Sequence, residues 1–217
     1  MLQKGFRILT DAVTIALLSV ALFLLFKPDG QLRRFWAERQ LESATREAVT
    51  RLWDDLTDTS DRLYTTAAEP DIIEVSDYTC PFCRAMHAVV DSALGTGIRI
   101  SYLHAPSSRP QAREAALAAI CAERSGHFDA MHRHLITTEA WLTDVDWRRE
   151  AVSAGVTDVD TFMICLEGSG ATARLATQRA LADSIGVSGT PMFVTRAGVH
   201  RGAGTLDDLL RLGSRSR

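Results

Sequence analysis

The sequence predicts an α/β domain in which a long helical segment interrupts a small sheet. Three observations predict it. Two cysteines, Cys80 and Cys83, stand between an apolar, strand-like run and a helix-like run. Residues from about 111 to 185 are helical in character. A strand, a turn and another strand then follow over residues 192–201. The sheet therefore joins strands from both ends of the domain, with the helical segment inserted between them.

The first half of this domain is predicted as strand, helix, strand. Residues 71–76 contain an isoleucine- and valine-rich run, which suits a strand in a sheet interior. Residues 81–94 predict a helix that ends at Gly95. Residues 98–103 alternate apolar and polar side chains, which predicts a second strand.

The second half begins with an alanine-rich helix over residues 112–123, the start of a helical insertion over about 109–185. A strand over 192–195, a turn into 199–201 and a short helix over 206–212 complete it. Taken in order, these elements are a thioredoxin fold with a helical insertion. A right-handed first crossover then places both cysteines at the carboxyl end of a central strand.

The C-P-F-C motif predicts thiol–disulfide exchange. Cys80 lies at a helix N-terminus, where free N–H groups and the helix dipole favour a thiolate, and Pro81 suits the first helical position. Cys83, one turn later, can close a redox-active disulfide with Cys80. The alternative is half of a zinc site, which would need a second ligand pair. Cys121 and Cys165 are 44 residues apart and do not form a second C-x-x-C.

The second motif is the loop that ends in Thr190 and Pro191. A proline at the start of a strand, after Gly-Thr, favours a cis peptide, although an ordinary trans proline is the alternative. In a thioredoxin fold this loop faces the C-x-x-C. The backbone of Thr190 can then pair with an extended substrate, so we expect Thr190 and Pro191 to bind substrate.

The N-terminal segment predicts an export signal or an anchor. Lys4 and Arg7 precede an uncharged run over residues 12–26. We expect a single-pass signal-anchor over residues 8–26, within an N-terminal region 1–27, and a cleaved signal peptide is the alternative. An even number of cysteines together with an export signal implies an oxidising compartment. The net charge of −3 argues against a nucleic-acid surface.

Residues 28–66 predict a helical stalk between that segment and a catalytic domain over 67–217. Small and apolar residues recur there at helical spacing: Leu41, Ala44, Ala48, Leu52 and Leu56. One interpretation is a helix packed on its own domain or lying near a membrane. The other is a stalk that forms a homodimer, for which the pattern is short.

The chain from about residue 68 to 212 resembles DsbA-like thioredoxin-fold proteins. The resemblance covers about two thirds of the chain and excludes the N-terminal segment and the stalk. Four motifs carry it, in the family's order: DYTCPFC over 77–83, AALAAICA over 115–122, GHFDAMH over 126–132 and GVSGTP over 186–191.

The resemblance implies roles for three residues. Cys80 matches the exposed, attacking cysteine, Cys83 matches its buried partner, and Glu74 matches a buried acid that assists proton transfer. The sequence supports this last role, because a carboxylate in an apolar strand beside a thiolate has a raised pKa. A strand-edge glutamate facing water is the alternative. Phe82 stands where the best-known member has a histidine that stabilises the thiolate, so we expect a less extreme oxidant.

Cys121 and Cys165 lie in the helical insertion, and apolar residues flank both. Two buried cysteines in an oxidising compartment predict a structural disulfide, and relatives with a second cysteine pair point the same way. A second exchange-active pair is the alternative, although neither cysteine lies in a C-x-x-C.

The leading hypothesis is a membrane-anchored thiol–disulfide oxidoreductase whose catalytic domain is extracytoplasmic, in the periplasm or on the outer face of a bacterial inner membrane. It would form disulfides in unfolded or reduced substrate proteins, and a membrane redox partner would reoxidise or reduce it. The alternatives are a disulfide isomerase or reductase, and a metal carrier that binds through Cys80 and Cys83.

We expect neither a cofactor nor a resident metal. The histidines His127, His132 and His134 cluster in the sequence, but on a helix His132 points away from the face that the other two share.

Overall fold

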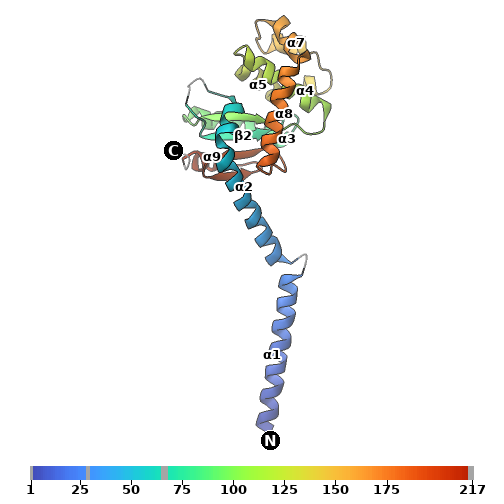
Figure 1. The fold of residues 1–217 in the computed structure, drawn as a ribbon, viewed down its shortest axis with the longest axis vertical. Helices are drawn as coiled ribbons and strands as arrows, with labels where there is room; N and C mark the ends of the chain where they lie inside the picture. Colours follow the sequence, from blue (N-terminus) through green and yellow to red (C-terminus); the bar gives the residue numbers. More distant parts are fainter. Residues whose placement is uncertain (1, 28–29, 65–67, 215–217) are drawn as a thin grey trace. The chain divides into compact units, whose positions relative to one another are not determined.

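The computed structural model describes residues 2–27, 30–64 and 68–214 (Figure 1). The chain forms two compact units, Met1–Ala44 and Thr45–Arg217. The first unit holds helix α1 (Leu2–Phe26) and the first half of helix α2 (Gln31–Thr59). Large apolar side chains of α1 between Val13 and Leu25 are exposed. Within the described residues, no helix has both the length and the apolar character needed to span a bilayer. The anchor expected over residues 8–26 stays a prediction.

The second unit is built on a sheet whose described strands lie in the order β1-β3-β2-β4-β5. The strands are β1 (Asp61–Arg62), β2 (Ile72–Ser76), β3 (Ile100–His104), β4 (Met192–Thr195) and β5 (Gly198–Arg201). β2 and β3 are parallel, and the other pairs are antiparallel. All residues of β2, β3 and β4 are buried. The predicted α/β order is confirmed, but β1 is an addition, because a two-residue polar strand leaves no pattern in the sequence.

Different helices cover the two faces of the sheet. Side chains alternate along a strand, so neighbouring residues of β2 contact different helices. Ile73 and Val75 of β2 pack with apolar residues of α2 and of helix α8 (Ser169–Ser184). Ile72 packs on the other face, against helix α3 (Pro81–Gly95) and helix α9 (Leu206–Ser214). Glu74 and Ser76 follow Ile72 at intervals of two, so they point to the same face as Ile72, toward α3.

The C-terminal half of α2 belongs to the domain core. Four of its side chains, Ala48, Val49, Trp53 and Leu56, are buried in the cluster that covers one sheet face. The expected stalk therefore packs on its own domain over this half. Ala48 and Leu56 belong to the set of residues at helical spacing that could have formed a homodimer contact. In the structure they pack in the core of their own domain.

The inserted helices gather at one end of the sheet, and α8 runs back from them to the strands (Figure 1). They are α4 (Pro110–Arg124), α5 (Phe128–Thr137), the 3-10 turn η1 (Ala140–Leu142), α6 (Trp147–Ser153), α7 (Val159–Glu167) and α8. Residues 115–122 of α4 are all buried, so this helix is the centre of the segment. A disulfide joins Cys121 of α4 to Cys165 of α7.

The packing of α2 can be tested with two tryptophans of the same helix. Trp53 is 1% exposed, whereas Trp36 is 57% exposed. We expect Trp53→Ala to lower the free energy of unfolding by about 3–5 kcal/mol, because it leaves a cavity in the core. Trp36→Ala should change it by less than about 0.5 kcal/mol. Denaturant unfolding measures both, and equal, small effects would contradict the docking of α2.

Candidate active site

The two free cysteines lie at the junction of β2 and α3, and their exposure differs. Cys80 is the N-cap residue of α3, with an extended backbone (φ −77°, ψ 120°), and its side chain makes no capping bond. Cys80 is partly exposed, whereas Cys83 is 1% exposed. An incoming thiol or disulfide can therefore reach Cys80, and Cys83 lies behind it.

The loop before β4 faces this dithiol. The Cys80 thiol donates to the carbonyl oxygen of Thr190 at 3.3 Å. The Thr190–Pro191 peptide is cis, and Pro191 is buried directly before β4. β4 pairs with β2, so residues that are 110 positions apart in the chain meet at one end of the sheet.

Glu74 is buried beneath the dithiol. Its side chain is on the α3 face of β2, and the residue is 3% exposed. Burial raises the pKa of Glu74 to about 7, and the nearby Ser76 hydroxyl opposes this shift only in part. The carboxyl group can therefore hold or release a proton near neutral pH.

The Cys83 thiol must lose its proton before it can react, and its pKa is also raised. Burial raises the pKa of Cys83 to about 12, the hydroxyls of Ser76 and Thr190 oppose the shift, and the charge of Glu74 adds to it. At neutral pH the Cys83 thiol therefore keeps its proton unless a base removes it. A buried thiol and a carboxyl group with displaced pKa values are typical partners in proton transfer.

Asp77 fixes the loop between β2 and α3. One of its carboxylate oxygens accepts from the amide and the hydroxyl of Thr79, at 2.8 and 2.9 Å. The other oxygen accepts from the amide of Ser107 at 2.9 Å. Asp77 thus holds the residues before Cys80 against the loop that follows β3. The sequence analysis missed this role, although an aspartate two residues before a turn amide is a common turn signal.

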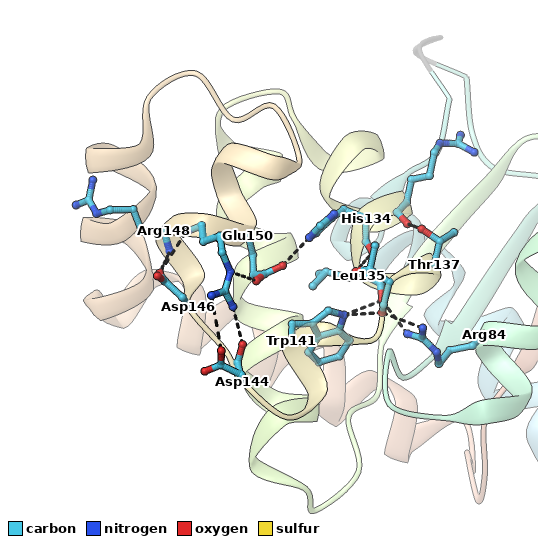
Figure 2. Close-up of polar contacts among 12 residues, drawn as sticks. Arg84, His134, Leu135, Thr137, Trp141, Asp144, Asp146, Arg148 and Glu150 are labelled. Carbon is cyan, nitrogen blue, oxygen red and sulfur yellow. Dashed lines mark hydrogen bonds and ion pairs between the residues drawn. The ribbon is translucent and has the colours of Figure 1, made fainter.

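Arg84 ties the active-site helix to the inserted helices (Figure 2). Its guanidinium donates to the carbonyl oxygens of Leu135 and Thr138, at 2.8 Å each. The Trp141 indole donates to the same two oxygens, at 3.1 and 3.0 Å. Arg84 follows Cys83 directly, so these bonds fix the start of α3 to the end of α5. A lone arginine after the motif gives no sequence signal for a partner about 50 residues away.

The three histidines singled out in the sequence have separate partners. Nδ1 of His132 is 3.2 Å from the Tyr78 hydroxyl, and burial lowers the pKa of His132 well below its usual range. Nε2 of His134 is 2.7 Å from Glu150, as Figure 2 shows. His127 lies beside Ser125. In the described part of the chain, no three potential ligands form a metal-binding group.

A small cavity of about 210 Å³ adjoins the loop that faces Cys80. Residues 187–190 form one wall, and Asp77, Ser107 and Arg179 form part of the rest. Its lining includes Thr190, whose carbonyl oxygen accepts from the Cys80 thiol, and it holds both apolar and charged groups. A larger cavity of about 870 Å³ lies between the end of α2 and the helices α3, α4 and α5.

Comparison with known protein families assigns this chain to one of them. A family profile described as thioredoxin matches residues 60–212. The chain belongs to the thioredoxin family. Among curated proteins, it is 31% identical over 142 residues to the Na(+)/H(+) antiporter NhaA 3 of Salinispora tropica. That match covers 64% of this chain and 22% of the antiporter, so the chain spans about a quarter of such relatives.

Solved structures agree with the family assignment. A thioredoxin-like oxidoreductase from Silicibacter pomeroyi is 28% identical, with a TM-score of 0.62 over 67% of this chain and 85% of that one. The thiol-disulfide exchange protein alpha-DsbA2 from Wolbachia pipientis is 18% identical, with a TM-score of 0.70 over 80% and 96%. A periplasmic thioredoxin-like protein from Salmonella enterica is 22% identical, with a TM-score of 0.61 over 73% and 90%. The DsbA-like fold is therefore confirmed.

The buried carboxyl group makes a testable link between pH and stability. Its pKa is raised from 4.5 to about 7 in the native protein. The native state therefore keeps a proton that the unfolded chain loses, and the free energy of unfolding falls as pH rises through this window. Relative to Glu74→Gln, the reduced wild-type protein should lose about 3 kcal/mol between a pH of about 4 and about 8.

Denaturant unfolding of both proteins over this pH range measures the difference. Other titrating groups are common to the two proteins, and the displaced Cys83 thiol ionises only above this range. A difference that stays constant with pH would show that Glu74 is solvated in the native state.

Proposed function

We propose that this protein is a thiol–disulfide oxidoreductase that donates disulfides to reduced substrate proteins outside the cytoplasm. The observation that carries the proposal is the asymmetry of the dithiol. Cys80 is accessible at the start of α3, 3.3 Å from the Thr190 carbonyl oxygen, and Cys83 is buried behind it. This arrangement allows attack at one sulfur only, so exchange proceeds through a single mixed disulfide.

The reaction takes place in two exchange steps. A substrate thiolate attacks the sulfur of Cys80 in the Cys80–Cys83 disulfide, and Cys83 leaves as a thiolate that takes a proton from Glu74. A second substrate thiolate then attacks the substrate sulfur of the mixed disulfide, and Cys80 leaves as a thiolate at the N-terminus of α3. The substrate loses two electrons and the dithiol gains them. A redox partner restores the disulfide by the reverse steps.

Thr190 and Pro191 hold the substrate in this proposal. Their loop faces the sulfur of Cys80, and an extended peptide can pair with the backbone of Thr190. The adjoining cavity of about 210 Å³ would take a side chain next to the substrate cysteine. Arg179 and Asp183 in its lining favour polar side chains there.

An oxidising compartment is supported by the Cys121–Cys165 disulfide, because such bonds persist mainly outside the reducing cytoplasm. The proteins described as a thiol-disulfide exchange protein and as a periplasmic thioredoxin-like protein share this fold. A membrane span is not part of the proposal. Thr190 before Pro191 and a dimerising stalk motivate the alternative of an isomerase or reductase. The stalk gives it less support, because Ala48 and Leu56 of α2 pack in the core of their own domain.

Two single-cysteine variants test the function. The oxidised full chain is mixed with a reduced, unfolded test protein, and the loss of substrate thiols is followed. Wild type should oxidise the test protein. Cys80→Ser should show only the background rate, because it cannot form the Cys80–Cys83 disulfide that is donated to the substrate.

Cys83→Ser is loaded at Cys80 with an aromatic thiol and mixed with a test protein that has a single cysteine. It should form a mixed disulfide that persists and is detected by mass, because neither Cys83 nor a second substrate thiol is present to resolve it. A Cys80→Ser protein that retains the wild-type rate would refute the proposal.

A further inference from the structure

The space beneath the dithiol contains a buried hydroxyl group that is not committed to any well-formed hydrogen bond among the described residues. Ser76 is 1% exposed, and its Oγ has no hydrogen-bond partner of good geometry among the described residues. A buried hydroxyl without a partner costs free energy, so its presence in a strand of the core needs an explanation. The hydroxyl of Tyr102 in the same space also has no partner there.

Ser76 lies next to both groups that exchange a proton. It follows Glu74 by two residues on β2, so the two side chains point to the same face of the sheet. That face is covered by α3, which carries Cys83. The Ser76 hydroxyl is close enough to both groups to lower the pKa of the Glu74 carboxyl group and of the Cys83 thiol by hydrogen bonding. Tyr102 pairs with Glu74 across β2 and β3 and stacks on Tyr78, with ring centroids 5.2 Å apart, which closes this space on one side.

A hydroxyl group can accept one proton and donate another at the same moment. A side chain of this kind between an acid and a base can pass a proton without ionising. Carboxylates and thiols lack this ability in the ionised state, since each is then only an acceptor.

We propose that the Ser76 hydroxyl carries the proton between Cys83 and Glu74. The proposal deepens the proposed function and rests on it. When Cys83 resolves a mixed disulfide, its thiol proton passes to Ser76 Oγ as the Ser76 proton passes to the Glu74 carboxylate. The Cys83 thiolate attacks the sulfur of Cys80, the bond between Cys80 and the bound thiol breaks, and that thiol leaves as a thiolate. When the dithiol oxidises a substrate, the same steps run in reverse.

The test separates the two sulfurs within one measurement. The reduced full chain is mixed with the chromogenic disulfide dithiobis(nitrobenzoate). Attack by Cys80 releases a first coloured thiolate, and resolution by Cys83 releases a second. In Ser76→Ala the first phase should keep its wild-type rate. The second phase should slow ~100-fold, at the lower end of typical general acid–base contributions.

Ser101→Ala is the matched control. Ser101 lies on the neighbouring strand β3, is fully buried and also has a hydroxyl without a partner among the described residues. It pairs with Ile73, so it points to the opposite face of the sheet, away from Cys83. We expect both of its phases to match wild type. Ser76→Thr, which keeps a hydroxyl, should restore most of the second-phase rate.

Three results would overturn the relay. These are an unchanged second phase in Ser76→Ala, an equal slowing of both phases, or an equal slowing in Ser101→Ala. If wild type itself releases no second thiolate, the exchange function fails, and this outcome is distinct from a failure of the relay. If Ser76→Thr does not fold, the comparison of the two alanine variants still decides the question.

Discussion

The burial of β2 on both faces is the constraint on which the site depends. β3 and β4 flank this strand, and helices cover both of its faces, so Glu74 is kept from water. Burial is the main cause of the raised pKa of Glu74 and of Cys83. Cys80, just beyond the end of the same strand, is partly exposed. One strand thus supplies a shielded acid, and the helix after it supplies an accessible sulfur and a hidden one.

Packing far from the dithiol keeps this arrangement rigid. The C-terminal half of α2 covers the sheet face opposite α3, with Trp53 and Leu56 in the core. Arg84 fixes the first turn of α3 to the carbonyl groups at the end of α5, and Asp77 fixes the preceding loop. A change in the inserted helices can therefore alter the position of the two cysteines without touching them.

Local patterns in the sequence predicted the order of the elements, the C-x-x-C at a strand–helix junction and the loop at Thr190. Each of these features depends on a few consecutive residues, so a single sequence is enough to predict it. The packing of the second half of α2 on its own domain was one of the two interpretations of the stalk, and the core confirms it. The strand β1 and the contacts of Asp77 and Arg84 were missed. These features depend on contacts between distant segments, as between Arg84 and Thr138, and a single sequence shows no such pairing.

The reduction potential of the Cys80–Cys83 pair tests the central claim most directly. It can be measured on the full chain by equilibration with glutathione and thiol tagging. Donation of disulfides predicts a value between about −120 and about −180 mV, the range of strong oxidants and isomerases. A value near about −270 mV, that of thioredoxin, would contradict the account, because the dithiol would then remain reduced and act as a reductant.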